Sequence, residues 1–235
     1  MKIAVINYSG NVGKTTVAAH LLKPRLNDAP IFSIESINAD ASADGVDVEQ
    51  MRGKKFGDLR NQLMSLDSAI VDIGASNVED FLKLMQQYAG SHEEFNFFVV
   101  PVVKEKKQQS DTINTIRALS VIGIPPDKIR VLFNKVDIDE DPREEFPAFF
   151  ALASSEKFFT ASADAVIHSN GVYEEIKDVG KSIADILSDP IDHRAELKVK
   201  TDPAERQFHI QMIGLKMLAR TAEKNLDRAF LALTA

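Results

Sequence analysis

The sequence has no cysteine and no tryptophan, and its five histidines show no metal-binding spacing. Without cysteine the chain forms neither a disulfide bond nor a thiolate metal site, and a reducing cytoplasm is the simplest expected location. No apolar run approaches the roughly 20 residues that a membrane-spanning helix needs. No charged-then-apolar leader opens the chain, so neither secretion nor a membrane span is indicated.

Positive charge is scarce over most of the chain. The net charge of −7 argues against a uniformly basic nucleic-acid-binding protein. Residues 191–235 differ, because their eight Lys/Arg and six Asp/Glu give a net charge of +2, against −9 for the rest. The length of 235 residues is enough for one large α/β domain with an appendage, and a hydrophobic content of 44% is enough to form its core.

Short apolar segments alternate with segments of helical periodicity over residues 1–190. This alternation predicts an α/β fold, a doubly wound and mostly parallel sheet with helices on both faces. Expected strands are Lys2–Ile6, Ala29–Ile34, Ala69–Gly74, Phe95–Val103, Lys128–Phe133 and Phe158–Ile167. Expected helices are Val17–Leu22, Val48–Leu66, Val78–Tyr88, Asp111–Gly123 and Val172–Leu187.

Residues 191–235 form the predicted C-terminal extension. A charged linker, Asp192–Asp202, precedes an amphipathic helix from Pro203 to about Leu233, which is either continuous or broken near Gly214. Its polar face carries Lys216, Arg220, Lys224 and Arg228. This stripe is either a solvated helix face or a surface for non-specific contact with DNA phosphates.

The segment Tyr8–Thr16 lies between the first strand and the first helix, which is the context of a phosphate-binding loop. Glycine permits backbone turns that let several N–H groups point at one anion. Lys14 adds a positive charge for the phosphates, and the Thr15 hydroxyl suits Mg²⁺. The predicted phosphate-binding residues are Gly10, Asn11, Val12, Gly13, Lys14, Thr15 and Thr16.

Two further polar groups follow predicted strands. Asp72 ends an apolar strand and is predicted to manage Mg²⁺ together with Thr15. Asn134-Lys135-Val136-Asp137 follows another strand, and the Asn134 amide can pair with the edge of a purine base. Asp137 can accept from the N1 and N2 donors of guanine, so it would favour GTP, although it also opens an acidic run.

These three elements together resemble the ParA/MinD-type ATPases with a deviant P-loop. The resemblance covers about residues 1–188, and within that class the opening Met1–Thr15 is similar to StbB/TraL-type proteins of conjugative plasmids. It implies an ATP-sandwich homodimer, Mg²⁺, a plasmid-encoded adaptor or DNA-binding protein as partner, and a role in plasmid partition, stability or transfer.

Two departures from that family bear on hydrolysis. Ser9 stands where partition-type members carry a second lysine that reaches the phosphates of the partner subunit. No Asp stands near Ile37-Asn38, where the family has its catalytic carboxylate, and Asp40 is the candidate replacement. We therefore expect ATP binding with slow, partner-stimulated or absent hydrolysis, with Lys14, Asp40 and Asp72 as the candidate catalytic residues.

Three alternatives to an ATP-dependent dimerisation switch remain open. Asp137 would mark a GTPase. Ser9 and the missing Asp would suit an ATP-binding adaptor without turnover. A small-molecule kinase can use the same loop. Such a kinase would be expected to have a lid that carries arginine, and the acidic segment Asp137–Glu145 is poorly suited to be that lid.

Overall fold

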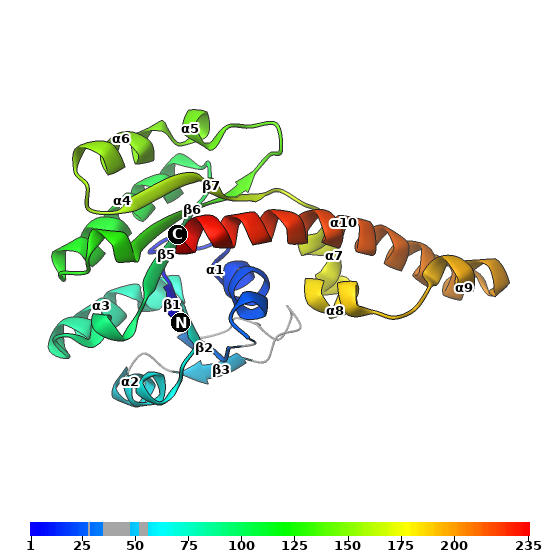
Figure 1. Cartoon of the computed structure of the whole chain (residues 1–235), viewed down its shortest axis with the longest axis horizontal. Helices are drawn as coiled ribbons and strands as arrows, with labels where there is room; N and C mark the ends of the chain where they lie inside the picture. Colours follow the sequence, from blue (N-terminus) through cyan, green and yellow to red (C-terminus); the bar gives the residue numbers. More distant parts are fainter. Residues whose placement is uncertain (28, 35–47, 52–55) are drawn as a thin grey trace.

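The computed structural model of the chain describes residues 1–27, 29–34, 48–51 and 56–235. Seven strands form one sheet in the order β3-β2-β4-β1-β5-β6-β7, and their pairings are parallel (Figure 1). The strands are β1 (Lys2–Val5), β2 (Ile31–Ile34), β3 (Val48–Met51), β4 (Ala69–Ile73), β5 (Phe97–Val102), β6 (Ile129–Val136) and β7 (Thr160–His168). The predicted fold class is therefore confirmed.

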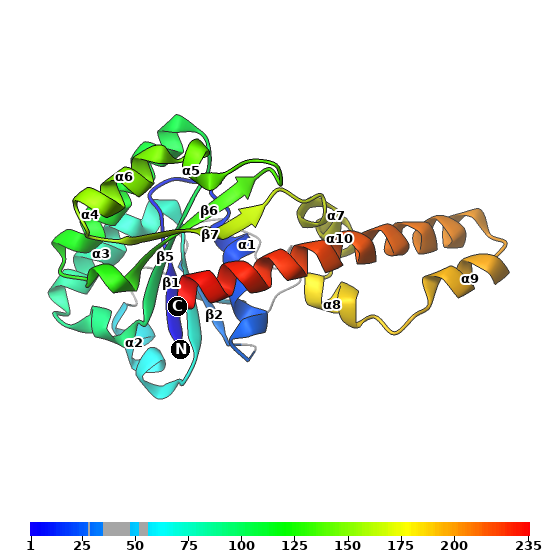
Figure 2. The same cartoon turned by 45° about the horizontal axis from the view of Figure 1, so that its top comes forward.

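Helices cover both faces of this sheet (Figure 2). A parallel sheet must bury both faces, and residues of β1 point alternately to opposite sides. Ala4, with Ile6 just after the strand, enters one apolar core, and Ile3 and Val5 enter the other. The first core lies under α2 (Phe56–Ser65), α3 (Val78–Gln87), α4 (Lys106–Val121) and α6 (Pro147–Ser155), with the short α5 (Pro142–Glu145) beside α6. The second lies under α1 (Lys14–Thr16) with its continuation η1 (Val17–Leu22) and η2 (Lys23–Arg25), α7 (Val172–Val179), α8 (Ile183–Ser188) and α10 (Pro203–Thr234).

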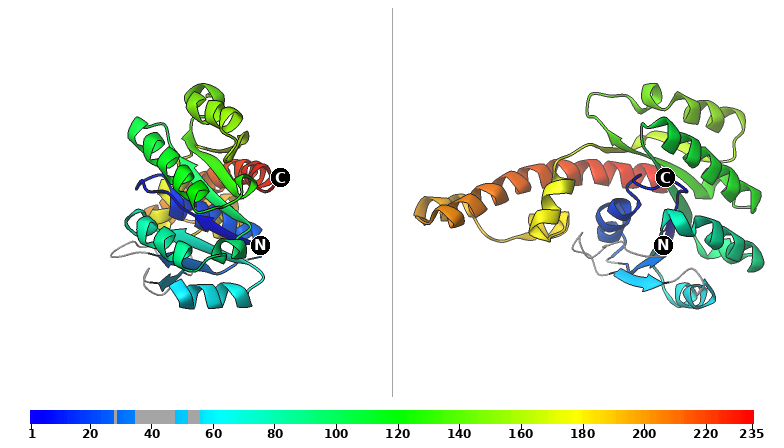
Figure 3. Two further views of the ribbon diagram at one scale, coloured as in Figure 1. Left: turned by 90° about the vertical axis from the view of Figure 1, so that its left-hand side faces the viewer. Right: turned by 180° about the vertical axis from the view of Figure 1, so that it is seen from behind.

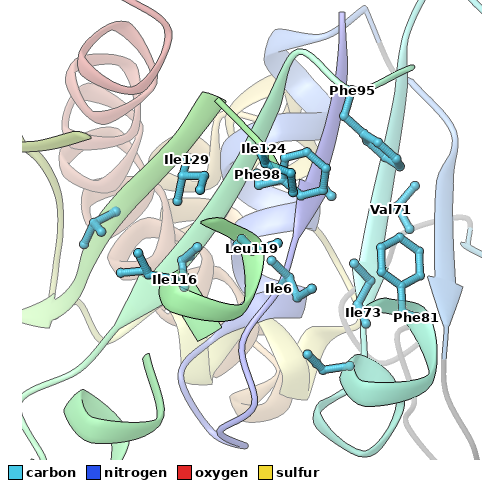
Figure 4. Close-up of a cluster of buried hydrophobic side chains, with 14 of the residues drawn as sticks. Ile6, Val71, Ile73, Phe81, Phe95, Phe98, Ile116, Leu119, Ile124 and Ile129 are labelled. Carbon is cyan, nitrogen blue, oxygen red and sulfur yellow. The ribbon is translucent and has the colours of Figure 1, made fainter. Parts of the chain in front are cut away.

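Aromatic side chains fill much of the first core (Figure 4). The ring centroids of Phe95 and Phe98 lie 5.1 Å apart, and those of Phe81 and Phe95 lie 6.5 Å apart in an edge-on arrangement. Such pairs add to the stabilisation that burial alone provides. Helix α4 packs on this core and also contacts the start of the predicted phosphate loop through Thr112 and Thr115.

The C-terminal helix α10 runs unbroken from Pro203 to Thr234, so the continuous form of the predicted helix is the correct one. The side chain of Asp202 accepts a hydrogen bond from the Glu205 N–H and caps its first turn. One stripe of its side chains belongs to the second core, and it comprises Met212, Leu215, Ala219, Ala222, Leu226, Ala229 and Leu233.

The first part of α10 projects from the body together with α9 (His193–Val199), as Figures 1 and 3 show. The two helices meet at a buried pair of histidines: Nδ1 of His193 lies 2.8 Å from Nδ1 of His209, and Nε2 of His193 lies 2.9 Å from Oδ2 of Asp189. Between residues 192 and 202 the expected linker thus contains a helix. Within the described residues, no helix combines the length and the hydrophobicity needed to span a membrane.

Two other expectations need correction. Val48–Leu66 is not one helix, because Val48–Met51 pairs with β2 as strand β3 and the helix begins only at Phe56. Val172–Leu187 is two helices, since Gly180 takes the left-handed conformation (φ 61°) and ends α7 before Ser182 caps α8. The expected loop at residues 35–47 lies outside the described residues.

Candidate nucleotide-binding site

The segment Tyr8–Thr16 lies at the carboxyl edge of the sheet. Its strand, β1, is central, with β4 on one side and β5 on the other. The chain builds β2, β3 and β4 on one side of β1 and then crosses to the other, so this is the topological switch point where ligands of such sheets bind. Gly13 has φ 85° and precedes α1, whose N-terminus faces the loop.

The loop presents a row of unpaired amide groups. Within the described part of the chain, the N–H groups of Gly10, Asn11, Val12 and Gly13 have no hydrogen-bond acceptor. Successive N–H groups of this kind form a concave site for an anion. Space is available as well, since a Cβ added to Gly10 would meet no atom within 4 Å.

The Lys14 side chain is buried and folds back over the loop. Its ammonium group donates to the carbonyl oxygens of Ser9 (2.8 Å) and Asn7 (3.2 Å). These contacts keep the cation beside the row of amide groups, where a phosphate oxygen can join or replace the carbonyls as its acceptor.

Thr15 and Asp72 lie together, as their motifs predict. The Thr15 hydroxyl donates a 2.8 Å hydrogen bond to Oδ2 of Asp72. Asp72 is buried in β4 and is the direct neighbour of Val5 in β1, so the sheet register brings it to the loop. A hydroxyl and a carboxylate beside a phosphate loop fit the oxygen donors that Mg²⁺ prefers. Among the described residues, no cluster of three or more His, Asp or Glu side chains is arranged to hold a metal ion.

Asn134 packs on the phosphate loop from the end of β6. Its amide nitrogen donates to the Val12 carbonyl (2.8 Å), and its amide oxygen accepts from the N–H of Lys135 (2.9 Å). Lys135 adopts a left-handed backbone (φ 58°), and its ammonium lies 3.4 Å from the Asn11 carbonyl. The amide of Asn134 retains one free N–H and one free lone pair for a base.

A pocket of about 360 Å³ opens next to these groups. One wall is the phosphate loop and another is the end of β6. Sequence reasoning missed the third wall, which consists of the end of β7 and the first turns of α7. The strand pattern carried a signal for it, because every segment that follows a parallel strand reaches the same edge of the sheet. The lining residues are Asn11, Gly13, Thr16, Asn134, Lys135, His168, Ser169, Asn170, Tyr173, Glu174 and Lys177.

Asp137 is not among those lining residues. Its carboxylate is exposed and lies 3.5 Å from the ammonium of Lys104, which also pairs with Glu140 at 2.7 Å. A hydrogen bond to Ser169, followed by the charge of Lys104, holds the pKa of Asp137 below its usual value. Asp137 thus interacts with Ser169 and Lys104 at the rim of the pocket. The other acidic candidate, Asp40, lies outside the described residues.

The buried His20 packs near Tyr173, which is partly buried and lines the pocket. The rings of His20 in η1 and Tyr173 in α7 lie 6.2 Å apart. Burial lowers the pKa of His20 to about 4, with the opposing effect of Asp185 smaller, and burial raises the pKa of Tyr173. Both side chains are therefore uncharged near neutral pH.

Three solved structures are similar to this chain over nearly its whole length. The cell division ATPase MinD of Pyrococcus furiosus is 15% identical, with 95% of this chain and 98% of that chain covered and a TM-score of 0.55. The chain has the MinD-type P-loop fold. A Cyanothece McdA variant in complex with ATP is 14% identical (94% and 96% covered, TM-score 0.52). A candidate plasmid partition protein from Borrelia burgdorferi B31, bound to AMPPNP, is 10% identical (92% and 98% covered, TM-score 0.50).

The MinD-type fold is what these likenesses establish, because identities of 10–15% carry no residue-level role from one chain to another. No protein-family model matches the sequence, and no curated protein does. Function therefore has to be argued from the site itself.

Proposed function

We propose that this chain binds ATP with Mg²⁺ at the loop Tyr8–Thr16 and acts as a nucleotide-controlled dimerisation switch in plasmid partition, plasmid stability or conjugative transfer. The observation that carries the proposal is the row of four unpaired amide groups, Gly10 to Gly13, beside the buried ammonium of Lys14. A triphosphate is the ligand whose charge and length fit such a row.

Thr15 and Asp72 would hold the Mg²⁺ that accompanies the nucleotide. Mg²⁺ supplies positive charge to the phosphate oxygens when it is bound. In this chain the Thr15 hydroxyl is oriented by Asp72, so the hydroxyl oxygen keeps its lone pairs for another partner. The buried carboxylate adds negative charge close to that oxygen.

The pocket bounded by Asn134 and α7 is the proposed site of the base. We favour adenine over guanine because Asp137, the residue that would select guanine, is held by Ser169 and Lys104 outside the pocket lining. The ATP and AMPPNP held by the McdA and Borrelia proteins support the same choice. A GTPase that redirects Asp137 remains the second candidate.

Hydrolysis is proposed to be slow without a partner. Ser9 is buried, its N–H is bound to Asn7, and its carbonyl accepts from Lys14, so position 9 supplies no cation to a transition state. An ATP-binding adaptor without turnover fits the same observation. In either case nucleotide binding at the loop would set the affinity for a second copy or for a plasmid-encoded partner.

DNA contact through α10 is a weaker part of the proposal. Lys216, one of the four stripe residues, donates to the carbonyls of Asp189 (2.8 Å) and Ile191 (3.0 Å) and so holds the turn between α8 and α9. Arg220, Lys224 and Arg228 are exposed. These three remain the candidates for phosphate contact.

The test is a titration of ATP and GTP with Mg²⁺, followed by size-exclusion chromatography. We expect tighter binding of ATP and a doubling of mass on its addition. Lys14→Ala should abolish both effects, whereas Lys23→Ala, seven residues beyond the last residue of the loop, should change neither. Equal ATP binding by the parent and Lys14→Ala would refute the proposal, and a strong preference for GTP would favour the second candidate.

A further inference from the structure

Asn7, at the start of the loop, is fully buried and ties three parts of the molecule together. Its amide nitrogen donates to the Pro101 carbonyl in β5 (2.8 Å) and to the Thr112 hydroxyl in α4 (2.7 Å). Its amide oxygen accepts from the N–H of Ser9 (2.8 Å). The loop is thus fastened to a strand and to a helix that contribute nothing to the phosphate-binding motif itself.

A second threonine of α4, Thr115, binds Tyr8, the residue between Asn7 and Ser9. The Tyr8 N–H donates to the Thr115 hydroxyl at 3.0 Å. Thr112 and Thr115 are both fully buried, and their hydroxyls donate to the carbonyls of Gln108 (2.7 Å) and Asp111 (2.8 Å) one helix turn earlier. The shorter bonds lie within α4, although the Thr115 hydroxyl also lies 3.5 Å from the Asn7 amide oxygen. Each hydroxyl oxygen accepts a hydrogen bond from the start of the loop.

Packing alone does not require these hydroxyls. Thr112 and Thr115 share their helix with the apolar core residues Ile116 and Leu119, and valine has nearly the same shape as threonine. A fully buried hydroxyl is costly unless it is hydrogen-bonded, and here each hydroxyl donates within α4 while its oxygen accepts from the start of the loop. The hydroxyls of Thr112 and Thr115 thus fix the position of the backbone at the start of the loop.

The backbone segment Asn7–Ser9, which these hydrogen bonds fix, is also the segment whose carbonyls accept from the Lys14 ammonium. The ammonium group donates to the carbonyls of Asn7 and Ser9, and the N–H groups of Tyr8 and Ser9 are the ones bound by Thr115 and Asn7. We propose that Asn7, Thr112 and Thr115 are positioning residues that set the Asn7–Ser9 backbone, and through it Lys14, for a nucleotide phosphate. Pre-ordering the loop lowers the cost of ordering it on binding. The inference rests on the proposed nucleotide binding.

The test compares ATP affinity in hydroxyl-deletion variants of the full chain. Thr112→Val and Thr115→Val remove one hydrogen bond to the loop each with little change of volume, and Thr112→Ser restores the hydroxyl. Thr234→Val is the control, because its hydroxyl donates to the Phe230 carbonyl one turn earlier on α10, and this end of the helix lies beside Arg130 at the start of β6, the opposite edge of the sheet from the loop. Affinity is measured with Mg-ATP at a temperature where circular dichroism shows each variant folded, so a loss of stability alone does not lower it.

We expect the double variant Thr112→Val/Thr115→Val to bind Mg-ATP about tenfold more weakly, the effect of one or two lost hydrogen bonds. Thr112→Ser should bind within about threefold of the parent, and Thr234→Val should match the parent. Affinity within twofold of the parent in the double variant overturns the inference, and so does a Thr112→Ser protein as weak as Thr112→Val. A parent chain that binds no nucleotide refutes the proposed function instead.

Discussion

Asn134 occupies the space in which any side chain at position 13 would have to lie. Its amide nitrogen donates to the Val12 carbonyl at 2.8 Å, and a Cβ built on Gly13 would overlap that nitrogen. Gly13 also has φ 85°, a conformation that residues with a side chain rarely adopt. Two independent constraints, one local and one tertiary, therefore require glycine here.

The first prediction concerns this pair. Gly13→Ala should lower the free energy of unfolding by about 1–2 kcal/mol, as expected for a side chain at positive φ against a buried neighbour, and weaken ATP binding at least tenfold. Urea unfolding and ATP titration measure the two effects. Gly214→Ala in α10 is the control, because its Cβ would also meet nothing within 4 Å, its φ is not positive, and it lies outside the loop. Equal behaviour of the two variants would show that Asn134 does not constrain the loop.

The second prediction concerns Asp72. Asp72→Asn keeps the shape of the side chain and an acceptor for the Thr15 hydroxyl but removes the negative charge. Mg²⁺ should then no longer tighten ATP binding, whereas binding without metal should change little or improve. The measurement is an ATP titration with Mg²⁺ and with a chelator. Asp80→Asn, exposed on α3, should leave the Mg²⁺ effect unchanged. A full Mg²⁺ effect in Asp72→Asn would remove Asp72 from the metal site.

The third prediction concerns pH. Burial lowers the pKa of His20 from 6.5 to about 4, so between these values the unfolded chain binds a proton that the folded chain does not. Stability is then complete above pH 6.5 and falls as the pH drops toward 4, by about 3 kcal/mol in total. His20→Leu should flatten this part of the stability curve in urea unfolding at pH 4 to 7. An unchanged slope would assign the acid sensitivity to other groups.

The fourth prediction concerns Tyr173. Its hydroxyl oxygen is buried and has no hydrogen-bond partner in the described part of the chain. Tyr173→Phe should therefore raise the free energy of unfolding, by about 1 kcal/mol, because an unsatisfied buried hydroxyl is removed. Tyr88→Phe, whose parent side chain is 38% exposed, should have little effect in the same thermal and urea measurements. Destabilisation by Tyr173→Phe would mean that this hydroxyl has a bound partner in solution.

Local sequence predicts much of the fold and the position of the candidate phosphate loop. Strand β1 is apolar on both faces and the loop glycines sit at fixed offsets from it, so strand, turn and helix can be read from neighbours in the chain. The proximity of Thr15 and Asp72 also follows from pattern, since parallel strands end at one edge. The strand Val48–Met51 could not be predicted from local sequence, because Glu49 and Gln50 suit a helix as well as a strand. Pairing with β2 makes this segment a strand.

The amino-acid sequence by itself determined the parallel α/β fold and placed a loop of phosphate-binding pattern at its start, because both depend on short-range periodicity and glycine placement. Only the tertiary structure decided which distant groups surround that loop. Thr112 and Asn134 reach it across 105 and 122 positions of the chain, and Tyr173 lines the adjoining pocket. Sheet order and helix packing, which no local pattern encodes, bring them there.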